Sequence, residues 1–169
     1  MTEDGSGPEG GSGPEDESGE GDENGDSSDA ATDGSGAPVD FDGLDRIRER
    51  LAGDDRFERV ESRPAYAPDR VVCTYDGGLY PPAISSASLA VAWFENGDFS
   101  IHYHEERESG TFDHRWDRHR SAHNSRDHVH PGPDAPTPGR DTSHPADWRD
   151  VLSTVLSEIE ARQRAFWNE

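Results

Sequence analysis

The sequence contains no lysine: all 16 of its basic residues are arginines, and 37 acidic residues oppose them. The formal net charge of −21 excludes a basic nucleic-acid-binding protein of the usual kind. Only one cysteine is present, which excludes a disulfide scaffold. The chain also lacks a run of about 20 apolar residues, so no membrane-spanning helix is expected. With 29% hydrophobic residues, it has room for one domain at most.

The N-terminal residues and the cysteine predict the compartment. The segment MTEDGSGPEG has neither the basic region nor the apolar region of a signal peptide. Cys73, within RVVCTYD, is typical of a small buried hydrophobic residue rather than of a catalytic thiol, which fits a reducing environment. We therefore expect a cytoplasmic protein.

An acidic sequence without lysine resembles the proteins of organisms that accumulate molar salt in the cytoplasm. At about 1 M salt the Debye length is about 3 Å, so like charges barely repel and carboxylates keep the surface hydrated. A genome rich in G and C also favours arginine over lysine, and an ordinary acidic bacterial protein is the alternative. In molar salt the negative charge argues only weakly against a nucleic-acid substrate.

Composition divides the chain at residue 40. Residues 1–40 contain 13 acidic residues, 10 glycines, 6 serines and no arginine. The few apolar side chains there cannot offset the entropy of ordering, which predicts a disordered acidic arm. Residues 41–169 are enough for one α+β domain with a modest core.

Hydrophobic periodicity predicts the elements of that domain. Apolar residues at 41, 44, 47 and 51 have helical spacing, and Gly53 is a natural helix end. Residues 146–167 predict a C-terminal helix, with Pro145 near its first turn. Between the helices we expect an antiparallel meander of about five strands, at 56–62, 70–76, 87–95, 98–107 and 111–118.

Two tight turns set the expected register of the last three strands. Asn96-Gly97 predicts a two-residue turn with positive φ at both positions, which pairs Phe94 with Phe99. A second turn at Ser109-Gly110 pairs Tyr103 with Trp116, His102 with Asp117, and His104 with Arg115.

Side-chain alternation then predicts the two faces of the sheet. One face, covered by one or both helices, carries Ala90, Ala92, Phe94, Phe99, Ile101, Tyr103 and Trp116. The other carries Leu89, Val91, Trp93, Ser100, His102, His104, Arg115 and Asp117.

Seven of the eight histidines lie between residues 102 and 130. The segment from 119 to 146 is rich in proline, histidine and aspartate and lacks periodicity, which predicts a long loop. The combination of Arg115, Trp116 and Asp117 at a strand end, then His119, His123, His128 and His130 before a terminal helix, resembles the TumE-type toxins of bacterial toxin–antitoxin pairs. The resemblance covers about residues 98–165 and suggests a small haloarchaeal relative. It implies an intracellular, growth-inhibiting protein with an antitoxin-like partner.

Three interpretations of the histidines stay open. The first is phosphodiester hydrolysis in RNA, where one imidazole accepts the 2′-hydroxyl proton, another protonates the leaving oxygen, and a cation binds the phosphate. The candidate catalytic residues are His102, His104, Arg115, Asp117, His128 and His130. The second is a transition-metal site, such as zinc, with His123, His128 and His130 as candidate ligands. The third is a loop ordered by hydrogen bonds alone.

No sequence motif for a nucleotide cofactor is present, so no cofactor is predicted apart from such a metal. The alternative function is a non-enzymatic interaction domain, whose exposed tryptophan and leucine face binds a protein partner. The enzymatic interpretation makes a geometric prediction. The histidine-rich loop should fold back over the polar sheet face and bring His128 or His130 close to His102, His104 or Asp117.

Overall fold

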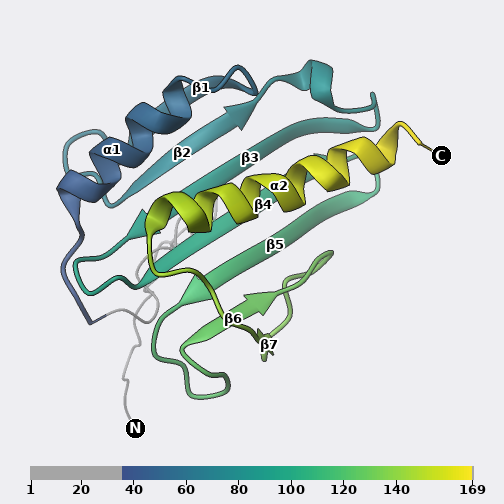
Figure 1. Cartoon of the computed structure of the whole chain (residues 1–169). Helices are drawn as coiled ribbons and strands as arrows, with labels where there is room; N and C mark the ends of the chain where they lie inside the picture. The colour runs from purple at the N-terminus through teal and green to yellow at the C-terminus, as the bar shows by residue number, and fades with distance from the viewer. Residues whose placement is uncertain (1–35, 169) are drawn as a thin grey trace, which may run out of the picture.

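The computed structural model of the protein describes residues 36–168. It is an α+β structure, in which helices α1 and α2 lie on the same face of one antiparallel sheet (Figure 1). The helices are α1 (Phe41–Ala52) and α2 (Trp148–Phe166), with a short 3-10 helix η1 (Gly77–Leu79). The strands are β1 (Phe57–Arg63), β2 (Arg70–Tyr75), β3 (Ile84–Trp93), β4 (Phe99–Arg107), β5 (Gly110–Arg118), β6 (Asp127–His130) and β7 (Arg140–Asp141).

An aspartate immediately precedes each helix as its N-cap residue. The Asp40 carboxylate accepts a 2.8 Å hydrogen bond from the Gly43 amide, and Asp147 accepts one of 2.8 Å from the Arg149 amide. These carboxylates satisfy amide donors that a helix leaves unpaired at its first turn, as expected for N-cap residues. The predicted end of the first helix at Gly53 is confirmed.

The strands follow one another in the sheet in sequence order, from β1 to β7. The first five correspond to the predicted meander. The prediction of an unbroken loop over 119–146 is wrong, because β6 pairs with β5 and the two-residue β7 pairs with β6. The histidine-rich segment therefore contributes a sixth strand that carries His128 and His130.

The turn between β3 and β4 differs from the predicted one by one residue. Trp93 lies opposite Phe99, so the predicted pairing of Phe94 with Phe99 is wrong. The Gly97 amide donates to the Phe94 carbonyl over 2.9 Å, and Gly97 has a φ of 78°. Only the glycine has positive φ, which makes this a three-residue hairpin loop that ends in a left-handed glycine.

That extra loop residue exchanges the two faces of β3. Leu89, Val91 and Trp93 face the helices and are at most 5% exposed. The predicted exposed face of tryptophan and leucine is therefore wrong, and so is its use as a partner-binding surface. Ala90 lies on the opposite face, in register with His102.

The hairpin between β4 and β5 is shifted by two residues from the prediction. His102 lies opposite Arg115 rather than Asp117, and His104 lies opposite Asp113 rather than Arg115. A shift of two residues leaves every side chain on its predicted face, because strands alternate with a period of two. Trp116 therefore still faces the helices, as predicted.

The core lies between the sheet and the two helices. It joins the inner side chains of β2 to β6 with those of α1 and α2. Cys73 belongs to this core, and burial raises the pKa of its thiol to about 12, as expected for a packing residue. No helix within residues 36–168 is both long and apolar enough to cross a bilayer.

The N-terminal limit of the described chain lies against the sheet. Val39 forms an isolated bridge with Phe94, and the Asp40 amide donates to the Trp93 carbonyl over 3.1 Å. The predicted arm spans residues 1–40, and residues 1–35 of it lie outside the described part of the structure.

Candidate functional site

The sheet face opposite the helices carries polar side chains on three neighbouring strands. The six predicted catalytic residues lie on this face: His102 and His104 on β4, Arg115 and Asp117 on β5, and His128 and His130 on β6. The register aligns His102, Arg115 and His130 in one row across the three strands. The predicted proximity of His128 and His130 to Asp117 is confirmed.

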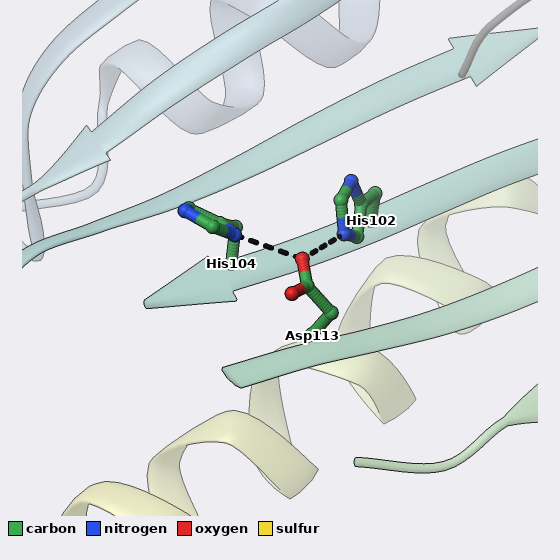
Figure 2. A group of neighbouring side chains, drawn as sticks. All are labelled: His102, His104 and Asp113. Carbon is green, nitrogen blue, oxygen red and sulfur yellow. Dashed lines mark hydrogen bonds and ion pairs between the residues drawn. The ribbon is translucent and has the colours of Figure 1, made fainter. Parts of the chain in front are cut away.

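Asp113 joins the two histidines of β4 into the first group (Figure 2). One carboxylate oxygen, Oδ1, lies 2.8 Å from His102 Nε2 and 2.8 Å from His104 Nδ1. A carboxylate only accepts hydrogen bonds, so both ring nitrogens donate. The other nitrogen of each neutral ring then carries a lone pair. All three side chains are partly exposed, at 25–30%.

The environment of the first group favours an uncharged His102. Burial lowers the pKa of this imidazole, and the hydrogen bond from its ring to Asp113 offsets only part of that effect. Burial alone would raise the pKa of Asp113, but the hydrogen bonds from His104 and His102 outweigh it and lower that pKa. The group thus favours the ionised form of the carboxylate and the neutral form of the His102 imidazole, which is the form that can accept a proton.

Asp117, His128 and His130 form a second group that is almost fully buried. The Oδ2 atom of Asp117 lies 3.3 Å from His130 Nε2 and 3.9 Å from His128 Nε2, and none of the three side chains is more than 4% exposed. Burial also lowers the pKa of His128, against the opposing effect of the Asp117 charge.

Arg115 connects the two groups. Its Nε atom donates a 2.8 Å hydrogen bond to Asp117 Oδ2, and its side chain is 29% exposed. In the sheet it lies directly between His102 and His130. A half-buried guanidinium therefore lies beside both histidine groups.

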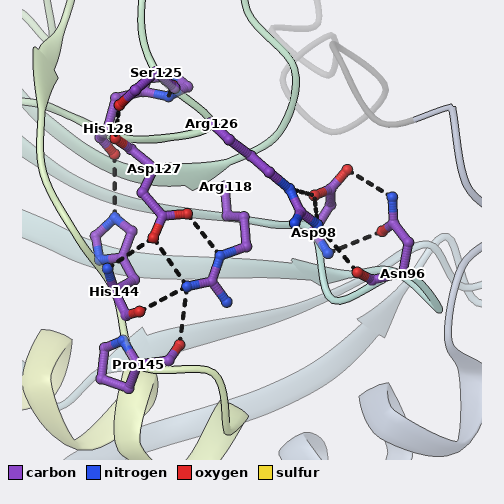
Figure 3. Close-up of polar contacts among 9 residues, drawn as sticks. All are labelled: Asn96, Asp98, Arg118, Ser125, Arg126, Asp127, His128, His144 and Pro145. Atoms are coloured by element: carbon purple, nitrogen blue, oxygen red, sulfur yellow. Dashed lines mark hydrogen bonds and ion pairs between the residues drawn. The ribbon is translucent and has the colours of Figure 1, made fainter.

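Two arginine–aspartate pairs hold the segment that leads into β6 (Figure 3). Arg118 donates to Asp127 over 2.7 Å, and Arg126 donates to Asp98, at the first hairpin turn, over 2.9 Å. His144 Nε2 donates to the His128 carbonyl over 3.2 Å, which ties the segment before α2 to β6. These arginines balance local acidic residues.

His119 and His123 have different environments. The His119 ring lies 4.8 Å from the His128 ring, and its Nδ1 donates to the Arg120 carbonyl over 3.0 Å. His123 is exposed and belongs to neither histidine group. The predicted ligand set His123, His128 and His130 does not come together. Two other sets have ligand atoms that all lie within 4.8 Å of one another: His102, His104 and Asp113, and Asp117, His119 and His128.

Sequence reasoning missed Asp113. Asp113, Arg115 and Asp117 alternate along β5, and this period of two would have placed them on one face once the strand was accepted. His114, between them, points to the helix face and stacks on Trp116 with ring centroids 4.2 Å apart.

A family model described as Toxin TumE matches residues 44–163. The chain belongs to the TumE toxin family. The match extends from α1 almost to the end of α2, so it begins well before the expected residue 98 and includes both histidine groups. No curated protein and no solved structure matches the chain.

Membership of the TumE family makes this a toxin-type protein. Within the TumE domain, the polar face offers imidazoles, carboxylates and a guanidinium, which are the groups that proton transfer at a phosphate ester requires. The same residues include nitrogen and oxygen donors suited to a transition metal.

Proposed function

We propose that this TumE-family protein inhibits growth by cleaving RNA, and that an antitoxin protein neutralises it. The observation that supports cleavage is the pair formed by His102 and His104, which share one oxygen of Asp113 next to Arg115. Two imidazoles and a guanidinium are sufficient for metal-independent cleavage of RNA.

The proposed step starts at an RNA 2′-hydroxyl. The free nitrogen of one imidazole removes the hydroxyl proton while the 2′-oxygen attacks the adjacent phosphorus. The bond from phosphorus to the 5′-oxygen breaks, and the protonated second imidazole donates its proton to that oxygen. The products are a 2′,3′-cyclic phosphate and a 5′-hydroxyl, and Arg115 stabilises the charge that develops on the phosphate.

Asp113 has a positioning role in this scheme. Its shared oxygen holds both rings in fixed orientations and stabilises whichever imidazole is protonated. Asp117 holds the Arg115 guanidinium in the same way, through the 2.8 Å hydrogen bond from Nε.

The test is cleavage of end-labelled single-stranded RNA by the purified full chain in molar KCl with EDTA. We expect products that end in a 2′,3′-cyclic phosphate. His102→Ala and His104→Ala should each reduce the rate by about 100-fold or more. His123→Ala is the matched control, because this exposed histidine lies in the same part of the chain but outside both groups. Cleavage at the normal rate by both variants would contradict the proposal.

The second candidate is a non-enzymatic toxin that acts by binding a protein. It is favoured by the way His128 and His130 bond to backbone carbonyls of their own loops, as structural histidines do. Growth inhibition on induced expression separates the two functions. An enzyme loses toxicity in His102→Ala, whereas a binding protein keeps it.

A further inference from the structure

Three histidines around Asp117 form the same kind of hydrogen bond. The Nδ1 atoms of His119, His128 and His130 lie 3.0, 3.0 and 2.7 Å from backbone carbonyl oxygens. A carbonyl only accepts hydrogen bonds, so each Nδ1 carries the proton. Each neutral ring therefore presents its Nε2 atom as a lone pair.

These lone pairs lie beside the Asp117 carboxylate, whose Oδ2 accepts a hydrogen bond from Arg115 and whose Oδ1 has no donor among the described residues. His130 Nε2 lies 3.3 Å and His128 Nε2 3.9 Å from Asp117 Oδ2. Within residues 36–168, the buried atoms His130 Nε2 and Asp117 Oδ1 have no hydrogen-bond partner. Arg115 satisfies Asp117 Oδ2 alone, so these two buried acceptors still lack the donor or cation that buried polar atoms require.

The histidines of the first group differ in this respect. His102 and His104 each turn an N–H toward Asp113, so donors meet an acceptor there and no cation is required. The orientation of the rings thus distinguishes a satisfied hydrogen-bonded group from an unsatisfied group of acceptors. Of the two histidine groups on this face, only the one around Asp117 contains buried acceptors that have no hydrogen-bond donor.

We infer that Asp117, His119 and His128 bind one Zn²⁺ ion, and that His130, whose Nε2 lies 3.3 Å from Asp117 Oδ2 but outside that group of three, turns toward the ion as the fourth donor. One ligand atom each from Asp117, His119 and His128 already lies within 4.8 Å of the others. Three imidazole nitrogens and one carboxylate oxygen suit zinc and neighbouring transition metals, and they do not suit Mg²⁺ or Ca²⁺. The carbonyl partners of the Nδ1 atoms are the outer contacts that orient zinc-bound histidines.

Such a site is a structural one. Four protein ligands fill the tetrahedral coordination of zinc and leave no open position for a substrate. The ion would join the end of β5, β6 and the His119 segment, which the Arg118–Asp127 pair already holds together (Figure 3). This inference does not rest on the proposed RNA cleavage, which uses the other histidine group.

The test measures Zn²⁺ binding by the full chain through competition with a chromophoric chelator. The assay buffer contains molar KCl and excess Mg²⁺, so that surface carboxylates do not bind Zn²⁺ non-specifically. We expect one tightly bound equivalent, a rise in the thermal midpoint on adding Zn²⁺, and the visible absorption of tetrahedral Co²⁺ when that ion replaces zinc. His128→Ala should weaken binding at least about tenfold. Because His128 is buried, the half-exposed His119→Ala serves as the second variant, with folding checked by circular dichroism.

His123→Ala and His104→Ala are the controls. Neither residue belongs to the inferred ligand set, so both variants should bind Zn²⁺ as tightly as the unaltered protein. The inference is overturned if the unaltered protein binds no equivalent of Zn²⁺, if folded His119→Ala binds equally well, or if binding disappears in His104→Ala instead. The first of these results would mean that protons alone neutralise the site.

Discussion

Arg162 on α2 binds both carboxylate oxygens of Glu105 on β4. Its Nε lies 2.7 Å from Oε1 and a terminal nitrogen lies 3.1 Å from Oε2. Glu105 is completely buried and also accepts from the Tyr103 hydroxyl and from Arg107. Burial alone would raise the pKa of Glu105, but these hydrogen bonds, led by that of Arg162, lower it. This charged contact therefore fixes α2 to the centre of the sheet.

The first prediction is that Arg162→Met lowers the free energy of unfolding by about 1–3 kcal/mol, because a buried carboxylate loses two charged hydrogen bonds. The Arg162 guanidinium also stacks on Phe112, at 3.5 Å from the ring centroid. Urea denaturation in molar KCl measures the change. The control is Arg164→Met, which removes an exposed pair with Glu160 and should cost less than about 0.5 kcal/mol. Equal losses in the two variants would show that the Glu105 contact contributes nothing special.

The second prediction concerns the hairpin that sets the faces of β3. Gly97→Ala should destabilise the protein by about 1–2 kcal/mol, because Gly97 has a φ of 78° and no other strain is introduced by the methyl group. Gly97→Asn should cost less, since asparagine tolerates this conformation. Gly77→Ala is the control, because its methyl group also meets open space and its φ is not in the left-handed region. Thermal unfolding of the three variants measures the change. The largest fall in thermal midpoint in Gly77→Ala would contradict this account.

The third prediction is a pH dependence of stability that comes from His114. Burial, aided by the charges of Arg140 and Arg162, lowers its pKa to about 4, whereas an unfolded histidine titrates near about 6.5. As the pH falls through this window, the unfolded chain binds the proton first, so the free energy of unfolding decreases. His114→Phe keeps an aromatic ring against Trp116 and should show a weaker decrease between these pH values. Denaturant unfolding at several pH values measures it, and identical slopes would contradict the assignment.

The elements of the fold were predictable because each has a strong local signal. Helical spacing with Gly53, and strand-like runs on either side of the two glycine turns, gave the α+β class. The face of β3 was not predictable in the same way. Asn96-Gly97 suits both a two-residue turn and a three-residue loop, and the choice depends on contacts outside the dipeptide. Asp98 is held by Asn96 and by Arg126, whose sequence position is distant.

The sequence predicted which sheet face carries the candidate site, but it did not predict the strand register, β6 or the role of Asp113. The four predicted residues of β4 and β5 lie on one face because the register error at the second turn was an even number of residues, which preserves alternation. His128 and His130 join that face through the pairing of β6 with β5. β6 was missed because four residues with two histidines have little strand propensity, and pairing with β5 decides their conformation. Asp113 is placed by the pairing of β5 with β4, and the His119 amide donates to the Arg126 carbonyl just before β6.

The strand order of the sheet also bears on how the polar face assembles. Its residues span positions 102 to 130 and come from three strands that are consecutive in the chain and adjacent in space. Only short loops must close to bring them together, so the entropic cost of closure is small. Contacts that are local in sequence favour fast folding. The polar face comes from one continuous segment of the chain, whereas the opposite face of the same strands is completed by the distant helix α2.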